Sequence, residues 1–408
     1  MNKRVVITGR AATSPLGTGV NESFQRLHKL ENCVQNDKDL AIYKGLHTRL
    51  DTKVKDFKIP EEFTRKVTRT MGDVAIMAVV TAKQALQDAG LLDNPIISSG
   101  ETGVSYGSCS GSYESLMDFY SMCVLKEVKN LNSGSYIKMM AHTAPVNISL
   151  YFKTKGRIIP TSTACTSGAL GIGSAYEAIK FGVQKVMIAG GSEEHTPSNI
   201  GVFDTLFATS VKNDTPKLTP SPFDKDRDGL VIGEGAATLI LEEYEHAKNR
   251  GAKIYAEVVG FATTSDGTHI TNPNPETMAE VMKMSLKSAG LSAKEIGYVN
   301  AHGTGTINGD IAESQATLDA LGNKCPISSI KSYTGHTLGA CGALEAIMSI
   351  EMMNNNWFCP NLNLNNVDER CAELDYIMTS PRAIDTQYIM SNNFAFGGIN
   401  TSLIFKRV

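Results

Sequence analysis

The chain alternates short apolar runs with longer stretches in which apolar residues recur every three to four positions. Residues 4–8 and 102–107 are runs of the first kind, and each leads into a loop that contains glycine or serine. Residues 69–90 are of the second kind, with apolar side chains on one helical face and a glycine at the end. This alternation predicts an α/β fold.

Other segments are interpreted from their composition. Residues 14–17 and 108–112 are expected to be loops, and residues 30–60 are polar and irregular. The run 113–152 is rich in methionine and tyrosine. It is expected to form helices that lie over the core, as a cap insertion near residues 108–150.

Two internal sequence repeats indicate that the chain is duplicated. Asp-Ala-Gly-Leu at 88–91 recurs as Ser-Ala-Gly-Leu at 288–291, each time at the end of a predicted helix. At an offset of 168, residues 171–179 match residues 339–347 at Gly, Ala, Glu, Ala and Ile. Chance matches among small residues are an alternative explanation.

The duplication predicts two halves, residues 1–250 and 251–408, each a series of βα units. The offset of 168 places Cys165 opposite Tyr333, three residues before His336. If the halves pack face to face, the matched helix starts meet at a pseudo-twofold axis. We therefore expect Cys165 and His336 to lie close together.

Composition narrows the possible functions. The 408 residues are 42% hydrophobic and 20% charged, with a net charge of −3, which argues against nucleic acid as the main partner. No apolar run approaches the roughly 18 residues of a membrane helix. The eight cysteines and eight histidines lack disulfide-scaffold and metal spacing. We expect free thiols in a cytoplasmic protein, no membrane partner and no metal.

Cys165 lies where a short extended run, residues 157–161, turns into a helix. The unpaired backbone N–H groups of a helix start favour an anion, so the thiol is expected to tend toward thiolate, the form that attacks carbonyls. Small residues surround it, which suits the close approach of a substrate. The alternative is a buried, inert cysteine before a core helix.

His302 and His336 each follow a predicted strand and precede a loop rich in glycine. Catalytic groups of α/β sheets gather at the carboxyl ends of strands, so both are catalytic candidates. Structural histidines in turns are the alternative for each.

Near the C-terminus, Phe396-Gly-Gly supplies a turn whose N–H groups could face an oxyanion. The alternative is that this turn merely closes a hairpin.

Five signatures occur in an order that resembles one family. They are Ser162-Thr-Ala-Cys165, Asn300-Ala-His302-Gly-Thr, residues 331–336 with Gly339, residues 222–229 with Gly233-Glu-Gly235, and Phe396-Gly-Gly. Together they resemble an elongating β-ketoacyl-acyl-carrier-protein synthase. The resemblance implies a thiolase-like αβαβα sandwich of two duplicated halves. It also implies a homodimer, or a heterodimer with a homologous synthase or chain-length factor.

The resemblance also implies an acyltransferase and its residue roles. Cys165 takes the acyl group, malonyl-acyl-carrier protein loses carbon dioxide, and neutral His302 and His336 stabilise the enolate. The backbone of Cys165 and Phe396 forms the oxyanion hole, Lys331 orients the histidines with Glu345 as its partner, and Phe396 is the gate. Thr271, Thr304 and Thr306 contact the pantetheine arm, which arrives on the carrier protein, so no cofactor is expected.

The chain departs from the family pattern at several positions. Gly305 and Ile307 interrupt the usual motif after His302, and Ala395 replaces a glycine, which puts movement of the gate in question. The resemblance assigns the acyl tunnel to residues that include Phe203. The remaining tunnel positions are small and polar, namely Ser108, Ser110 and Ser112. Such a wall suggests an unusual acyl chain.

Acyl carrier proteins are acidic, so a basic docking surface is expected. The family docks its carrier on residues that correspond to Arg65, Lys66 and Arg69, and we expect Lys126 and Lys129 to extend this patch. A solvated helix face is the alternative. Two other functions remain open. They are a non-catalytic partner subunit like a chain-length factor, and a thiolase-type enzyme acting on acyl-CoA.

Overall fold

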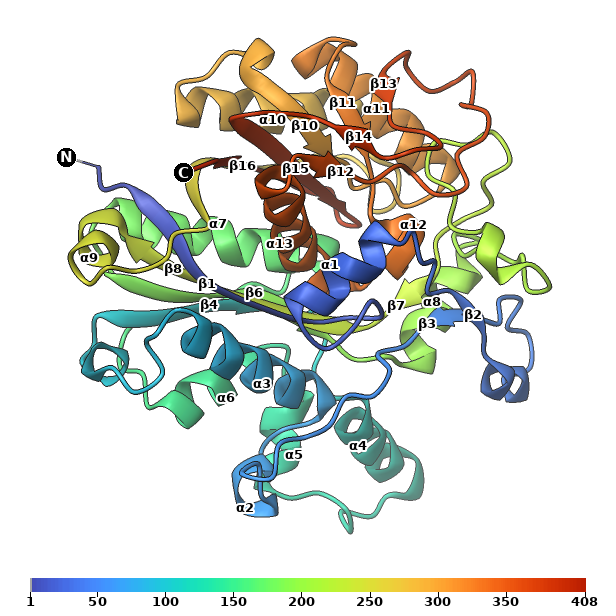
Figure 1. The fold of residues 1–408 in the computed structure, drawn as a ribbon. Helices are drawn as coiled ribbons and strands as arrows, with labels where there is room; N and C mark the ends of the chain where they lie inside the picture. Colours follow the sequence, from blue (N-terminus) through green and yellow to red (C-terminus); the bar gives the residue numbers. More distant parts are fainter. Residues whose placement is uncertain (1) are drawn as a thin grey trace.

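The computed structural model describes residues 2–408 and is built around one sheet of eleven strands (Figure 1). Their order across the sheet is β13-β11-β10-β15-β16-β9-β1-β8-β6-β4-β5. The strands are β1 Val5–Thr13, β4 Thr102–Gly107, β5 Ile158–Pro160, β6 Val186–Glu193, β8 Gly235–Glu243, β9 Ala256–Ser265, β10 Ile296–Asn300, β11 Pro326–Ser328, β13 Asp375–Tyr376, β15 Tyr388–Ala395 and β16 Ile399–Lys406. Smaller sheets contain β2 Gln35–Asn36, β3 Leu50–Thr52 and β7 Ile232–Gly233, and β12 Trp357–Phe358 with β14 Arg382–Ala383.

Helices cover both outer faces and fill the centre of the molecule. They are α1 Val20–His28, α2 Arg65–Thr68, α3 Asp73–Asp88, α4 Tyr113–Leu125, α5 Ser133–Met139, α6 Thr143–Phe152, α7 Ser167–Lys180, α8 Pro197–Thr205, α9 Tyr244–Asn249, α10 Pro275–Ala289, α11 Ile307–Leu321, α12 Lys331–Thr334 and α13 Cys341–Asn354. Figure 1 shows that the strands lie in two layers, with β1, β4, β6 and β8 in the lower layer and β10, β15 and β16 in the upper layer. Helices α3 and α6 lie below the lower layer, α7 and α13 lie between the layers, and α10 and α11 lie above the upper layer. The predicted αβαβα sandwich is confirmed.

The duplication is visible in the central helices, but its register differs from the prediction. The short 3-10 turn Ala164–Thr166 precedes α7 as Leu338–Ala340 precedes α13, at an offset of 174 rather than 168. Ala164 and Leu338 both have left-handed φ, 52° and 45°. Cys165 is therefore opposite Gly339 and not Tyr333. The matches at 168 joined mostly small residues that are six positions, or about one and two-thirds helical turns, out of register.

The repeated Ala-Gly-Leu sequence ends equivalent helices. Gly90 follows α3 with a φ of 66°, and Gly290 follows α10 with a φ of 69°. The next leucine in each case donates its N–H to a carbonyl of the last turn. Glycine adopts this left-handed conformation without a steric penalty, so the sequence fixes both helix ends. The division of the chain at residue 250 stays a prediction.

One element boundary differs from the sequence analysis. β1 continues past Gly9 to Thr13, because β8 pairs with it along its full length across an irregularity between Ile7 and Gly9. The helix after Cys165, α7, ends at Lys180, and Val183 lies beyond it, 43% exposed.

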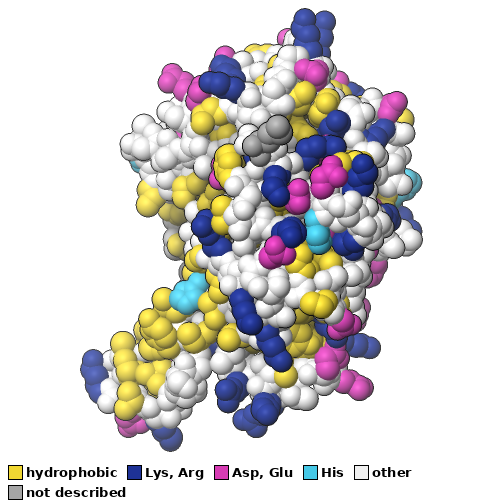
Figure 2. All heavy atoms as spheres, turned by 90° about the vertical axis from the view of Figure 1, so that its left-hand side faces the viewer, with side chains coloured by type: hydrophobic (Ala, Val, Ile, Leu, Met, Phe, Trp, Pro, Cys, Tyr) yellow, Lys and Arg dark blue, Asp and Glu magenta, His cyan; other side chains and the backbone are white. Residues whose placement is uncertain are grey.

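The cap predicted near residues 108–150 is helical, as expected, and comprises α4, α5 and α6. Figure 2 shows hydrophobic side chains gathered on a lobe that protrudes at the lower left of the molecule, at the level of this cap. The exposed apolar side chains of the cap are Leu116, Met117, Tyr120, Val124, Leu125, Val128, Tyr136 and Leu150. Among residues 2–408, no helix combines the length and the apolar character needed to span a membrane.

Candidate active site

Cys165 lies in the turn between β5 and α7, as predicted, and is buried. Hydrogen bonds fix this turn: the Ser167 hydroxyl accepts from the Thr163 N–H at 2.9 Å and donates to the Ala164 carbonyl at 2.7 Å. The Thr161 hydroxyl donates to the Ser167 carbonyl at 2.9 Å. The nucleophile candidate is thus held on a rigid elbow that includes the left-handed Ala164.

Burial opposes the thiolate character that was expected for Cys165. Burial raises the pKa of Cys165 to about 12, although Lys331 and the backbone N–H groups of Cys165 and Phe396 lower it. Desolvation of the charged sulfur therefore outweighs the helix start. The two N–H groups that face the sulfur are the ones that the resemblance assigned to the oxyanion hole.

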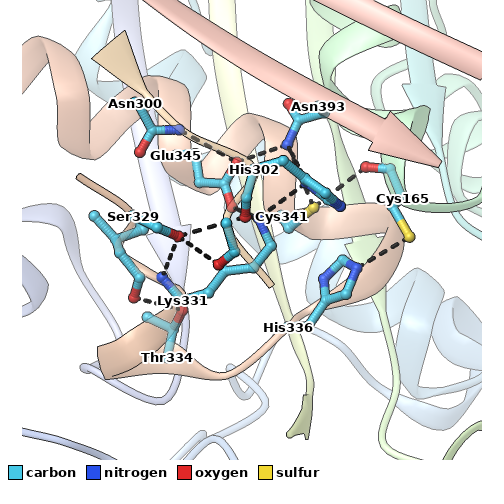
Figure 3. Close-up of polar contacts among 12 residues, drawn as sticks. Cys165, Asn300, His302, Ser329, Lys331, Thr334, His336, Cys341, Glu345 and Asn393 are labelled. Carbon is cyan, nitrogen blue, oxygen red and sulfur yellow. Dashed lines mark hydrogen bonds and ion pairs between the residues drawn. The ribbon is translucent and has the colours of Figure 1, made fainter. Parts of the chain in front are cut away.

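His336 follows α12 and reaches Cys165 from the other half of the chain. Its Nε2 lies 3.0 Å from the Cys165 Sγ (Figure 3). Its Nδ1 accepts from the Leu338 N–H at 3.2 Å, so the ring proton is on Nε2, facing the sulfur. Its backbone pairs with Val231 and Gly233, which explains the Gly233-Glu-Gly235 signature.

His302 lies at the end of β10, with its ring centroid 5.2 Å from that of His336. The Lys331 Nζ and the Asn393 Nδ2 approach its Nδ1 at 3.1 and 3.3 Å. Both groups are donors, so Nδ1 accepts and the proton of His302 is on Nε2. Burial, followed by Lys331, holds the pKa of both histidines well below the usual range. Both imidazoles are therefore neutral N–H donors near pH 7.

Lys331 is buried at the centre of a polar network that Figure 3 draws. Its Nζ forms an ion pair with Glu345 and donates to the His302 carbonyl at 2.7 Å. Burial opposes its charge, but Glu345 keeps the pKa of Lys331 above its ordinary value. The predicted pairing of Lys331 with Glu345 is present.

Three further residues of this network were not singled out from the sequence. Asn393 donates to Glu345 at 2.7 Å, and Asn300 donates to the same carboxylate at 3.4 Å. Glu313 accepts from the N–H groups of His302 and of the next residue, both at 2.7 Å. Asn300 opens one of the five signatures and Asn393 lies three residues before another, so a signal was present for both, whereas nothing near Glu313 in the sequence marked it.

The tertiary structure gathers possible metal ligands that the sequence keeps apart. Ligand atoms of Cys165, His302 and His336 lie within 4.8 Å of one another, and Asp37, Asp51 and His195 form another such cluster. In the first cluster, donors at both Nδ1 atoms place protons on the nitrogens that face Cys165. This arrangement suits hydrogen-bond donation better than metal ligation, which needs a free nitrogen lone pair.

A cavity of about 370 Å³ leads to these three side chains. Thr271, Thr304 and Thr306 line it, as the resemblance implied for a pantetheine arm. Phe203 and Phe396 also line it, and their ring centroids lie 5.3 Å apart. The two rings thus stand together where the gate and the tunnel were expected.

Ser108, Ser110 and Ser112 do not line this cavity. The Ser108 hydroxyl lies 3.0 Å from the carbonyls of both Ser110 and Ala141, and its one proton is shared between them, so it joins the loop to the cap. Ala395 ends β15 opposite Ile399 and has no left-handed φ, so alanine fits its backbone. The left-handed positions of this loop are Gly397 and Gly398.

The five basic residues predicted to dock a carrier are exposed and lie on or near the cap. Arg65 and Lys66 are in α2, and Arg69 is its C-cap. Lys126 is the C-cap of α4, with Lys129 three residues beyond. None of the five lines the cavity in the described chain.

Known proteins resemble the whole chain. Residues 2–247 match the family Beta-ketoacyl synthase, N-terminal domain, and residues 255–365 match Beta-ketoacyl synthase, C-terminal domain. The 3-oxoacyl-[acyl-carrier-protein] synthase 2 of Vibrio harveyi is 36% identical over 413 residues, covering 100% of this chain and 99% of that protein.

Solved structures agree with this match. A beta-ketoacyl synthase from Burkholderia phymatum STM815 is 55% identical, with a TM-score of 0.98 and complete coverage of both chains. A type II PKS ketosynthase, solved in complex with its acyl-carrier protein, is 29% identical with a TM-score of 0.89, again over both whole chains. This chain belongs to the β-ketoacyl synthase family.

Proposed function

We propose that this protein transfers an acyl group to Cys165 and condenses it with malonyl-acyl-carrier protein to give a β-ketoacyl-acyl-carrier protein. The contact that carries the proposal is the 3.0 Å approach of the His336 Nε2 to the Cys165 Sγ, beside a second neutral imidazole. The synthase names of the relatives support the same reaction. The enzyme is an acyltransferase.

The first step is acyl transfer. The Cys165 sulfur attacks the carbonyl of the incoming thioester, and the carrier thiol leaves with the proton that Cys165 gives up. The covalent intermediate holds the acyl group in place while the second substrate binds. Because burial keeps the free thiol protonated, a transfer that is neutral overall suits this site better than a preformed thiolate.

The second step is decarboxylation followed by carbon–carbon bond formation. As carbon dioxide leaves, negative charge develops on the malonyl thioester oxygen, and the Nε2–H groups of His302 and His336 donate to it. The resulting carbanion attacks the carbonyl carbon of the acyl thioester, whose oxygen accepts from the N–H groups of Cys165 and Phe396. The bond between this carbon and the Cys165 sulfur then breaks, and the thiolate that leaves takes up a proton from water to restore the thiol. Lys331 acts as a positioning residue through its contact with His302.

The substrate enters on a carrier-borne arm in this proposal, so the enzyme needs no cofactor of its own. Thr271, Thr304 and Thr306 would contact that arm in the cavity. The acyl chain would continue past Phe396 once its ring separates from Phe203, with Gly397 and Gly398 as the hinge. The assignment of Ser108, Ser110 and Ser112 to the tunnel wall stays a prediction, since these residues do not line the cavity.

We also infer that two copies pair, as a homodimer or with a homologous synthase. β5 is the last strand of the sheet, so one side of it has no partner strand in residues 2–408. The apolar side chains of α4 lie exposed on the cap. An open edge strand and an apolar face both favour association with another chain.

All eight cysteines are free, which supports a cytoplasmic location.

Intact-mass spectrometry tests the reaction. After incubation with acyl-carrier protein, the enzyme should gain the mass of the acyl group, and adding malonyl-carrier protein should discharge it as the β-ketoacyl product. Cys165→Ala should gain no mass and form no product, whereas Cys123→Ala, which changes an exposed cysteine outside the cavity, should behave as the wild type. Condensation by Cys165→Ala would contradict the proposal.

The other two functions have less support. A non-catalytic partner needs no nucleophile, but here Cys165 is held on a fixed elbow against His336. A thiolase-type enzyme would need a second cysteine in the loop after β15, where this chain has Phe396.

A further inference from the structure

Four apolar side chains that line the cavity are also exposed to solvent. They are Leu206, Phe207, Ile270 and Ile307, with exposed fractions of 48%, 82%, 71% and 46%. Three separate segments supply them: the loop after α8, the loop between β9 and α10, and the start of α11. We call these four residues the apolar rim, because they are both at the cavity and in contact with water.

Phe207 is held outward by its own turn. Its φ is 52°, a conformation that residues other than glycine seldom adopt. The Asp204 carbonyl accepts the Phe207 N–H at 2.9 Å, while the Asp204 carboxylate accepts from the backbone of His47 and Thr48. The turn is therefore tied down on both sides. A large aromatic side chain in an unfavourable and fixed conformation, left 82% exposed, indicates a role outside the fold.

The rim is connected to the gate loop. The Gly397 N–H donates to the Ile270 carbonyl at 2.7 Å, directly after Phe396. This hydrogen bond joins the backbone of the apolar rim to the loop that carries the Phe396 ring.

The charge around the cavity does not favour an acidic partner. Among residues 2–408, no lysine or arginine lines the cavity, whereas Asp228, Asp266 and Glu313 do. The basic residues of α2 and of the α4 end are not part of this lining. An electrostatic attraction of the kind expected from the sequence is thus missing at the opening itself.

We propose that the apolar rim is a docking surface for the carrier protein, which contacts it through apolar side chains next to the thioester arm. The inference rests on the proposed function: an arm that reaches Cys165 through the cavity places the body of its carrier over the opening. Phe207 would be the anchor, since large aromatic side chains dominate binding energy at interfaces. Salt should weaken this contact little.

Steady-state kinetics with two substrates test the proposal: an acyl-carrier protein, and the same acyl group on free pantetheine. In Phe207→Glu and Ile270→Glu, the ratio of kcat/KM for the carrier substrate to that for the pantetheine substrate should fall about tenfold or more. Val183→Glu, which places the same charge at an exposed apolar site outside the cavity, should keep the wild-type ratio.

Each result separates the rim from the chemistry. An unchanged ratio in both rim variants overturns the proposal. The proposal is also overturned if the ratio falls only in Lys66→Glu and Arg69→Glu, and the KM for the carrier substrate rises about tenfold between low and physiological salt. Those two results together would show that the carrier docks by charge. A wild-type enzyme acylated by neither substrate overturns the proposed function instead. Circular dichroism of each variant confirms that it is folded.

Discussion

At the scale of single residues, the site depends on which nitrogen of each imidazole carries the proton. Leu338 N–H fixes this for His336, and Lys331 with Asn393 fixes it for His302. These donors lie on the side of the rings that faces away from Cys165. The residues that set the chemistry are therefore outside the cavity, where substrate binding does not disturb them.

Replacing Lys331 should change the pH dependence of catalysis. Lys331 is the second cause, after burial, that lowers the pKa of His302. In Lys331→Met the pKa of His302 rises, although burial still holds it below its ordinary range, so the ring becomes protonated and stops acting as a neutral donor at a higher pH than in the wild type. We expect the acid limb of the kcat/KM profile to lie at higher pH in the variant than in the wild type.

The double variant Lys331→Met/Glu345→Gln serves as the control for the carboxylate that Lys331→Met leaves unpaired in the core. It should show the same shift of the acid limb with better stability. Superimposable pH profiles for the wild type and both variants would show that Lys331 does not tune His302.

At the scale of elements, repeated local sequence produced equivalent helix ends and elbows in the two halves. Ala-Gly-Leu ends α3 and α10 in the same way, because only the glycine must adopt a left-handed φ. The correspondence between residues of α7 and residues of α13 could not be derived from the sequence in the same way. Matches among alanine and glycine carry little information, whereas the left-handed residue before Cys165 and before Gly339 is visible only in the structure.

The edge strand β5 and the cap helix α4 predict association. In Val124→Glu/Leu125→Glu, two charges replace apolar side chains that are 55% and 64% exposed. Charge at the centre of an apolar interface leaves it without a partner, so the dimer should dissociate. Light scattering should give about twice the mass of one chain for the wild type and one chain for the variant.

Val183→Glu is again the matched control and should remain dimeric. A wild type that is already one chain at micromolar concentration would exclude the homodimer. A heterodimer with a homologous synthase would then be the assembly to test.

At the scale of the whole molecule, one buried arginine ties the two halves together near the cavity. The Arg227 guanidinium, fully buried, contacts Asp368 at 2.6 Å and Asp310 at 3.4 Å. It also donates to the carbonyls of Thr306 and Ile307 at 3.2 and 2.9 Å. The signature at residues 222–229 is therefore structural. It fixes the loop that carries the threonines of the cavity.

Removing this arginine should destabilise the protein. Arg227→Met leaves Asp310 buried without its cation and leaves Asp368 paired with Arg370 alone, so the free energy of unfolding should fall by about 3–5 kcal/mol. Urea denaturation measures this difference. Lys283→Met breaks the exposed ion pair with Asp319 and should change stability by less than about 0.5 kcal/mol. Equal effects of the two substitutions would contradict the role given to Arg227.

The sequence by itself determined the α/β alternation, the cap and the duplicated halves, because periodicity and turn residues act over a few positions. It also singled out Cys165, His302 and His336 as candidates, which the structure brings together. The family resemblance added the partnership of Lys331 with Glu345 and extended these predictions to the five-layer fold.

Only the tertiary structure decided the protonation of Cys165, the proton positions on the two histidines and the residues at the cavity opening. Each depends on desolvation or on donors that come from distant segments. Glu313 and Phe207 gave no local signal for this reason: one meets the backbone of His302 only after folding, and the other is exposed at the cavity only because a buried carboxylate fixes its turn.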